Sequence, residues 1–425
     1  MHDNYHNIIN LINKLNDIGQ NTASLEMTQN VINALKINPQ YPIILVGGTN
    51  GKGSTCGYLT NILMESNYKV GTFTSPHIFK YNERICIDNI PISDDNFIKY
   101  TRYVATNSNN SLGIFKTITL ACHLYFMEQD IDIAVIEVGI GGRCDVTNLF
   151  EPTISAVTNV ELDHCEILGD DRYKIGFEKA HIYRPHKWAF YGDNSPPQSI
   201  LEYANKIDSK IQILNQDFGY IEHENCFDVW CENVKYYSLP YPLLRGIKQP
   251  QNAALSIAIL SKLRSTFPIT LSAIKNALLK TKPVGRFDVM PGLPQIIFDV
   301  AHNLNAVEVM TQNMVKLPYA KNNIAVFGIM KDKQYRQILQ HAVKYFNIWH
   351  IAQLDSSRTT CTNELQELLV EYGIEKHNIY TYDKIALGMK YALEDLSSQD
   401  RVVCFGSFLA VSDAYAILEN LKKRV

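Results

Sequence analysis

The chain has 425 residues, more than one ordinary domain holds, so its length predicts two domains. Hydrophobic residues make up 46% of it, charged residues 20%, and the formal net charge is -3, which gives no reason to expect a nucleic-acid or membrane partner. The nine cysteines lack zinc-ribbon spacing, and we expect free thiols in a reducing cytoplasm. The N-terminus lacks a signal-peptide pattern, and no apolar run has the length of a membrane span.

Helical and strand patterns alternate through the N-terminal part. Apolar residues at helical spacing predict two helices within 5–36, broken near 19–24. Short apolar runs predict buried strands at 43–46, 69–74, 131–138 and 154–160. Further helices are expected at 98–104, 117–127, from 172 onward, 250–263 and 272–279. Segment 218–237 alternates poorly and predicts a small antiparallel patch.

The stretch YPIILVGGTNGKGST, at 41–55, combines a strand, a glycine-rich loop and the start of a helix that can reach Glu65. The backbone N–H groups of such a loop converge on phosphate oxygens, and Lys52 adds a positive charge. The usual P-loop places Ser or Thr directly after the lysine, whereas here Gly53 separates Lys52 from Ser54. An ordinary glycine turn with a chance lysine is the alternative interpretation.

Polar residues follow several of the predicted strands. Ser75 follows the strand at 69–74, Glu137 ends the strand at 131–138, and His164 lies beyond the strand at 154–160. The carboxyl ends of parallel strands meet at one edge of a sheet, where ligands bind. Beside a phosphate loop, a magnesium site is favoured, because Mg²⁺ prefers oxygen ligands and nucleotide phosphates. A buried salt bridge for Glu137, and a helix cap or core hydrogen bond for His164, are the alternatives.

The pattern restarts near Lys282, which predicts domains at 1–282 and 283–425. In the second domain, strands are expected at 296–300, 324–329, 348–352, 378–382 and 402–405, with helices between them. The fold class is therefore α/β: an N-terminal, P-loop-type, mostly parallel sheet domain with an antiparallel patch, followed by a Rossmann-like α/β domain.

Motifs along nearly the whole chain resemble the folylpolyglutamate synthase/dihydrofolate synthase family of Mur-ligase-like, ATP-dependent amide ligases. In the first part they are VGGTNGKGST, TSPH (74–77), ERI (83–85), EVGIGGRCDVTN (137–148), TNVELDHCEILGD (158–170) and EKAHI (178–182). In the second part they are QNAAL (251–255), GRFD (285–288), DVAHN (299–303), DK (332–333) and GSF (406–408).

The resemblance implies roles for individual residues. Contacts with ATP are expected from Thr49, Asn50, Gly51, Lys52, Gly53, Ser54, Asn252, Arg286, Asp299 and His302. The metal ligands are expected to be Ser75, Glu137, His164 and Lys179, with Lys179 carbamylated and two Mg²⁺ ions bound. The catalytic residues are expected to be Lys52, Lys179 and His302, and the pterin substrate is expected near Thr22, Phe115 and Arg143.

The chain also departs from the family pattern. His181 replaces a usual glycine, Lys116 follows Phe115 in place of an acid, and Val300 and Leu304 alter the D-G-A-H-N-P motif. The segment beginning at Thr22 lacks the D-L-G sequence that helps bifunctional bacterial members to bind dihydropteroate. These differences concern the choice of pterin substrate rather than the ligase chemistry.

The resemblance therefore predicts a cytoplasmic monomer that adds L-glutamate to dihydropteroate and to reduced folates through an acyl phosphate, with ATP as co-substrate. A folylpolyglutamate synthase without dihydropteroate activity is the first alternative. A Mur ligase acting on a muropeptide precursor fits TSPH and GGRCDVTN poorly. A non-catalytic nucleotide-binding paralogue is the alternative from another class.

Overall fold

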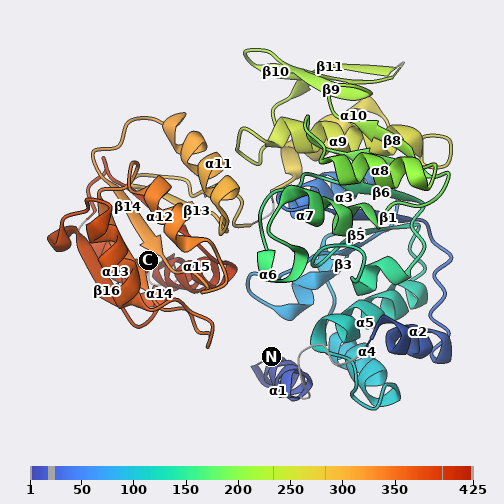
Figure 1. Cartoon of the computed structure of the whole chain (residues 1–425), viewed down its shortest axis with the longest axis horizontal. Helices are drawn as coiled ribbons and strands as arrows, with labels where there is room; N and C mark the ends of the chain where they lie inside the picture. Colours follow the sequence, from blue (N-terminus) through green and yellow to red (C-terminus); the bar gives the residue numbers. More distant parts are fainter. Residues whose placement is uncertain (1, 18–23, 233, 283, 395, 423–425) are drawn as a thin grey trace. The chain divides into compact units, whose positions relative to one another are not determined.

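A computed structural model describes residues 2–17, 24–232, 234–282, 284–394 and 396–422, and it divides into two compact units (Figure 1). The first unit comprises Met1–Val160, Asp170–Tyr241 and Pro250–Thr281. The second comprises Glu161–Gly169, Pro242–Gln249 and Lys282–Val425. Two short segments from the N-terminal part therefore group with the C-terminal unit.

The first unit is built on an eight-stranded sheet in the order β4-β3-β2-β5-β1-β6-β7-β8. Its strands are β1 (Ile43–Gly47), β2 (Val70–Phe73), β3 (Ile85–Ile87), β4 (Ile90–Pro91), β5 (Ile133–Glu137), β6 (Ile154–Val157), β7 (Trp188–Tyr191) and β8 (Lys210–Ile213). Neighbours from β2 to β8 pair in parallel, and β3 and β4 add an antiparallel edge. β1 and β5 are buried throughout, as expected of strands covered on both faces.

The strand order of this sheet does not follow the order of the strands in the chain. β1 and β2 are parallel, but each pairs with β5, which lies between them. This order places the end of β5, and with it Glu137, beside the loop that follows β1. The sequence predicted β1, β2 and β5 but not their order in the sheet, because strand order depends on pairings between residues distant in the chain.

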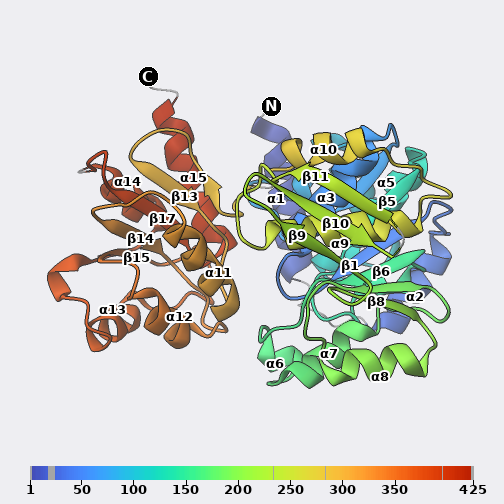
Figure 2. The ribbon, with the colours of Figure 1, turned by 90° about the horizontal axis from the view of Figure 1, so that it is seen from above.

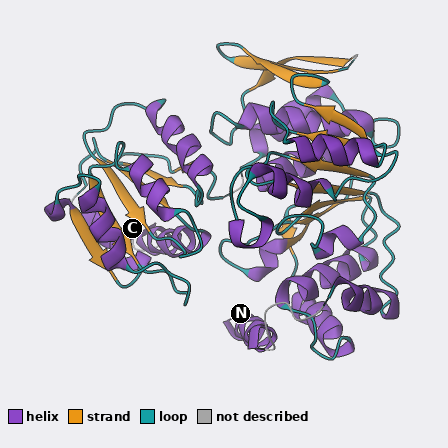
Figure 3. Cartoon of the chain, in the orientation of Figure 1, coloured by secondary structure: helices purple, strands orange, loops and turns teal. Residues whose placement is uncertain are grey.

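The predicted helices of the first unit are present, with others between them. They are α1 (His2–Asp17), α2 (Leu25–Ala34), α3 (Lys52–Glu65), α4 (Asp94–Asn107), α5 (Ile114–Glu128), α7 (Arg172–Ala180), α8 (Gln198–Lys206), α9 (Gln249–Lys262) and α10 (Leu271–Lys280), with short 3₁₀ turns η1 (Tyr81–Arg84) and η2 (Val146–Leu149). The antiparallel patch is a separate three-stranded sheet (Figure 3). It contains β9 (Phe218–Glu222), β10 (Cys226–Cys231) and β11 (Val234–Pro240).

The second unit has a six-stranded sheet in the order β12-β13-β17-β14-β15-β16. Its strands are β12 (Asp288–Val289), β13 (Gln295–Phe298), β14 (Asn323–Phe327), β15 (Ile348–Ala352), β16 (Ile379–Tyr382) and β17 (Arg401–Phe405). Its helices are α6 (Cys165–Leu168), α11 (Leu304–Val315), α12 (Tyr335–Ala342), α13 (Thr362–Glu371), α14 (Ile385–Glu394) and α15 (Phe408–Lys422), with η3 (Lys376–Asn378). Figure 2 shows α11, α12 and α13 on one face of this sheet and α14 and α15 on the other.

Aromatic packing fills the centre of the second unit. The ring of Phe405 lies 4.9 Å from Phe327 and 5.3 Å from Phe346, centroid to centroid. Trp349 is fully buried against the same cluster. Among the described residues, no helix is long and apolar enough to cross a membrane.

One core histidine gives a testable pH dependence. His123 on α5 is fully buried; its Nδ1 lies 2.9 Å from the Tyr41 hydroxyl, and its ring centroid lies 3.7 Å from that of Phe150. Burial lowers the pKa of His123 to about 3, whereas an exposed histidine titrates near 6.5. Between these values the unfolded chain binds a proton that the folded chain excludes, so this histidine costs stability as the pH falls below 6.5.

We therefore expect His123→Phe to reduce the loss of stability between pH 7 and pH 5 by about 2 kcal/mol. Chemical denaturation at the two pH values measures this difference, whatever the absolute stability of the variant. His186→Phe is the control, because that side chain is 75% exposed. An unchanged pH dependence in His123→Phe would show that the buried ring is not the group responsible.

Candidate functional site

The loop between β1 and α3 has the backbone geometry of an anion-binding loop. Gly48 has φ 138°, and a Cβ there would lie 1.9 Å from Oγ1 of Thr158, so only glycine fits. Gly51, at φ 85°, is the N-cap of α3. Because α3 begins at Lys52, Ser54 and Thr55 lie in its first turn. The loop thus presents N–H groups at the positive end of a helix.

Bonds to β6 and its following residues fix this loop. The N–H of Thr49 donates to the carbonyl of Asn159 at 3.0 Å, and the N–H of Asn50 donates to the Asn159 side chain at 2.9 Å. The Thr158 hydroxyl donates to the carbonyl of Asn50 at 2.6 Å. A Cβ on Gly51 would lie 2.9 Å from Oδ1 of Asn252, so this α9 residue also packs against the loop. The structure thereby brings the predicted ATP contacts of the first unit together.

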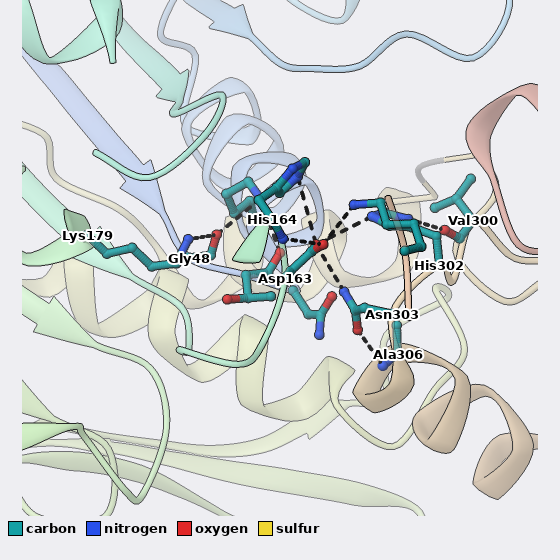
Figure 4. Close-up of polar contacts among 12 residues, drawn as sticks. Gly48, Asp163, His164, Lys179, Val300, His302, Asn303 and Ala306 are labelled. Atoms are coloured by element: carbon teal, nitrogen blue, oxygen red, sulfur yellow. Dashed lines mark hydrogen bonds and ion pairs between the residues drawn. The ribbon is translucent and has the colours of Figure 1, made fainter. Parts of the chain in front are cut away.

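Two lysines converge on one carbonyl of the loop. The Nζ atom of Lys52 lies 3.2 Å from the carbonyl oxygen of Gly48 and 3.1 Å from that of Thr49. The Nζ atom of Lys179, on α7, donates to the same Gly48 oxygen at 2.9 Å (Figure 4). Lys179 is only 4% exposed. Lys179 is far from Lys52 in the sequence, but its buried side chain contacts the phosphate loop, so it is part of the site.

A buried carboxylate lies at the neighbouring strand end. Glu137 is 2% exposed, and its register partner on β1 is Val46. Its Oε2 atom accepts a hydrogen bond of 3.0 Å from the backbone N–H of Ser75, which follows β2. The structure therefore brings Ser75 and Glu137 together at the edge where the phosphate loop lies.

This arrangement fits a divalent cation bound with a nucleotide. Among the described residues, no group of three or more His, Cys, Asp or Glu side chains forms a metal site. Mg²⁺ at nucleotide sites uses one or two carboxylates together with hydroxyl, water and phosphate oxygens. A buried glutamate beside a serine and a phosphate loop is a suitable donor set of that kind.

Two of the residues expected near the pterin, Phe115 and Arg143, lie in the first unit. Phe115, in the first turn of α5, has its ring 5.9 Å from Phe73, and a Cβ on Gly139 would lie 2.6 Å from it. Arg143 pairs with Glu178 at 2.8 Å and is half-exposed. Thr22 lies outside the residues that the structure describes.

Lys116, the substituted position, is partly buried beside Phe115. Burial lowers the pKa of its ammonium group, and the charge of Asp145 opposes that shift. Asp145 is itself buried and accepts hydrogen bonds from the N–H of Ile140 and from Thr147. A cation therefore stands next to the aromatic ring where the family usually has an acid.

In the second unit, Asp163 is the centre of a charged cluster that includes the predicted residues His164 and His302 (Figure 4). Its Oδ1 atom lies 2.7 Å from Nζ of Lys333, and its Oδ2 atom lies 3.6 Å from Nε2 of His302 and 4.0 Å from Nε2 of His164. The side chain of Asn303 donates to Oδ2 at 3.3 Å. Burial alone would raise the pKa of Asp163, but the hydrogen bond and charges of its partners hold it well below its usual range.

The Val300 carbonyl and the Asp163 carboxylate lie beside the two ring nitrogens of His302. Its Nδ1 lies 2.8 Å from the carbonyl oxygen of Val300, which can only accept, so Nδ1 carries a proton. Its Nε2 lies 3.6 Å from Oδ2 of Asp163. His164 occupies the N-cap position of the four-residue helix α6, but its side chain makes no capping bond. His164 therefore has the helix-cap position through its backbone carbonyl, and its side chain lies toward Asp163.

Arg286 and Asp299 form a second polar group in this unit. The guanidinium of Arg286 lies 5.3 Å from the ring centroid of Phe408. Asp299 accepts hydrogen bonds from the N–H of Ala301 at 2.8 Å and of Phe287 at 3.0 Å. Burial raises the pKa of Asp299 to about 6, although the charge of Arg286 opposes the shift. The predicted residues of the second unit therefore lie at the carboxyl end of β13 and the start of α15.

Comparisons with known proteins agree over almost the whole chain. The Mur ligase middle domain matches residues 46–214, and the Mur ligase, glutamate ligase domain matches residues 285–408. The chain is 32% identical over 379 residues to a dihydrofolate synthase/folylpolyglutamate synthase of Buchnera aphidicola subsp. Schizaphis graminum, with 88% of each chain covered. It is 31% identical over 411 residues to the Escherichia coli protein of that name, covering 96% of this chain and 93% of the relative.

Solved structures give the same result. A structure of E. coli FolC in complex with DHPP and ADP has a TM-score of 0.90 at 30% identity, with 97% of each chain covered. A bifunctional folylpolyglutamate synthase/dihydrofolate synthase with Mn, AMPPNP and L-glutamate bound has a TM-score of 0.86 at 29% identity, covering 94% of this chain and 95% of the other.

Proposed function

The chain belongs to the folylpolyglutamate synthase/dihydrofolate synthase family of Mur-type ligases, and we propose that it uses ATP to add L-glutamate to dihydropteroate and to reduced folates. The proposal rests on one edge of the sheet in the first unit. There, Lys52 and Lys179 donate hydrogen bonds to the phosphate loop, and Glu137 is buried beside that loop. It is an amide-forming ligase with ATP as co-substrate.

The reaction proceeds in two steps. The substrate carboxylate attacks the γ-phosphorus of ATP, which gives an acyl phosphate and ADP. The α-amino nitrogen of glutamate then attacks the acyl carbon, phosphate leaves, and the nitrogen loses a proton. In the first step two anions must approach each other, so the loop N–H groups and Lys52 are needed to offset their repulsion.

Ser75, Glu137 and His164 are the residues that we propose as ligands for Mg²⁺, with carbamylated Lys179 adding anionic oxygens. Two bound ions would neutralise phosphate and carboxylate charge. The complex of a relative with Mn and AMPPNP supports a divalent metal in this family. Glu137 is held for this role by the Ser75 N–H and by its place at the end of the fully buried strand β5.

Arg286, Asp299 and His302 are proposed as the second unit's contacts to ATP, and Phe115 and Arg143 as contacts to the pterin. Asn252 is proposed to bind ATP from α9, where it already packs against Gly51. Thr22, outside the described residues, stays a prediction from the resemblance. Action as a cytoplasmic monomer on small molecules, without nucleic acid or membrane partners, also stays a prediction.

A direct assay tests the bifunctional activity. Purified enzyme is incubated with ATP, Mg²⁺ and L-glutamate, and with either dihydropteroate or tetrahydrofolate, and the amide product is measured by mass spectrometry. We expect one glutamate to be added to each pterin substrate, with phosphate release that requires both pterin and glutamate.

The alternatives give different results in the same assay. Product from tetrahydrofolate alone would indicate a folylpolyglutamate synthase, in which Lys116 and the Thr22 segment exclude dihydropteroate. Nucleotide binding without any pterin-dependent phosphate release would indicate a non-catalytic paralogue.

A further inference from the structure

The motifs TSPH and ERI contain a histidine and an arginine that the proposed reaction has not yet used. Arg84 ends η1 and directly precedes β3, and its carbonyl accepts from the N–H of Thr74 at 3.1 Å. β2 and β3 are antiparallel, with Phe73 paired to Ile85. Arg84 therefore lies beside Ser75, at the same edge of the sheet as Glu137.

Three contacts fix the direction of the Arg84 side chain. Its Nε donates to Nδ1 of His77 at 3.0 Å, and its guanidinium carbon lies 5.4 Å from the ring centroid of Tyr81. The rings of His77 and Tyr81 are themselves 4.1 Å apart. Burial lowers the pKa of Arg84, while the nearby charges of Tyr81, Glu137 and Glu83 oppose that shift. The guanidinium is thus packed, oriented and within the field of Glu137.

The loop that carries His77 is also held in place. The carboxylate of Glu83 accepts backbone N–H bonds from Ile78, Phe79 and Lys80, at distances from 2.7 to 3.2 Å. Because an arginine N–H can only donate, Nδ1 of His77 must accept, and the ring proton is on Nε2. His77 is therefore a neutral anchor for Arg84.

The two terminal nitrogens of Arg84 are available to bind a ligand. Arginine has five N–H donors, and His77 uses the one at Nε. Within the part of the chain that the structure describes, the two terminal NH₂ groups bond to no protein acceptor, and the side chain is partly exposed. A guanidinium with both terminal groups available matches a carboxylate or phosphate in a bidentate manner.

The order of the strands distinguishes between these two anions. From β1 through β5 and β2 to β3, the edge carries the phosphate loop, Glu137, Ser75 and then Arg84. Adjacent strands are about 4.8 Å apart, so the Arg84 backbone lies roughly 14 Å along the edge from the loop. The loop and Lys52 are placed to bind the ATP phosphates. Arg84 lies on the other side of Glu137, and we expect the substrate carboxylate to approach the γ-phosphate from that side.

We infer that Arg84 binds the carboxylate of the pterin substrate that ATP phosphorylates, and that His77 is a positioning residue for Arg84. The inference rests on the proposed function, because that function supplies the carboxylate. Phe115, on α5, packs against Phe73 at the end of β2, so a pterin near Phe115 would have its carboxylate end within reach of this edge.

Equilibrium binding tests the inference with two ligands, dihydropteroate and its uncharged carboxamide, in the presence of ADP and Mg²⁺. We expect Arg84→Gln to weaken dihydropteroate binding about 10- to 100-fold and to change carboxamide affinity by less than about twofold. Arg102→Gln, on the exposed side of α4, removes the same charge and is expected to change neither affinity.

His77 is tested by a matched pair of variants. The substitution His77→Asn keeps a hydrogen-bond acceptor near the Nδ1 position, whereas His77→Leu removes it. We expect His77→Leu to weaken dihydropteroate binding about 3- to 10-fold and His77→Asn to restore most of that loss, with carboxamide affinity constant throughout.

Other outcomes would overturn the inference. Equal losses for both ligands in Arg84→Gln would show a structural role, and weaker ATP binding with unchanged dihydropteroate affinity would assign the guanidinium to phosphate. A wild-type enzyme that binds neither dihydropteroate nor tetrahydrofolate would instead reject the proposed function. The two failures are therefore distinguishable.

Discussion

Lys52→Ala is expected to lower the rate of ligation about a thousandfold while leaving the fold intact, because it removes the charge that offsets repulsion between the substrate carboxylate and the γ-phosphate. In the structure the ammonium group bonds to the carbonyls of Gly48 and Thr49, within the loop that would hold the phosphates. Single-turnover formation of the acyl phosphate, measured as burst release of ADP, isolates the affected step.

The control for this variant is Lys69→Ala. Lys69 precedes β2 and bonds to the carbonyl of Gln129, at the end of the sheet away from the loop. Its substitution therefore removes a lysine-to-carbonyl bond and one charge without touching the phosphate loop. Near-normal turnover of Lys52→Ala at saturating ATP, or an equal loss in Lys69→Ala, would contradict the role of Lys52 in phosphoryl transfer.

The phosphate loop could be predicted from the sequence because its determinants are local. A buried apolar strand, glycines at positions that need positive φ, and a lysine at the helix start all lie within the stretch 41–55. Glu137 was predicted for the same reason, since a carboxylate ending an apolar strand requires a partner. Strands β7 and β8 were missed; β8 alternates polar and apolar residues and is only partly buried.

The charged cluster around Asp163 could not be predicted in the same way. Asp163 and Lys333 are 170 positions apart, and their contact depends on the segment Glu161–Gly169 grouping with the second unit. The pairing of His77 with Arg84 is closer in sequence, but it depends on the turn that Glu83 stabilises. The sequence motifs contain these residues, but only the three-dimensional contacts show which partner each side chain binds.

Substitution of Lys179 is the second change for which we expect a large loss of activity, and the reason is the position of its side chain. Its amine lies 2.9 Å from the Gly48 carbonyl oxygen, the amine of Lys52 lies 3.2 Å from the same oxygen, and the Lys179 side chain is buried. The Lys179 ammonium group would lose one proton, and the neutral amine would form an N–C bond with CO₂ and release a second proton, so that a carbamate anion replaces a cation. Near Mg²⁺ and Lys52 that exchange is stabilising.

Lys179→Ala is therefore expected to lower activity on the order of 100- to 1000-fold, and acetate or a similar small carboxylic acid is expected to restore part of it. The rescue follows if the carbamate acts by supplying oxygens and negative charge, because a free carboxylate supplies both. Lys174→Ala, on the same helix but with its side chain 57% exposed, is the control and should be active with or without acetate. Full activity of Lys179→Ala, or an unmodified lysine in the active wild-type enzyme by mass spectrometry and crystallography, would exclude carbamylation as the source of the effect.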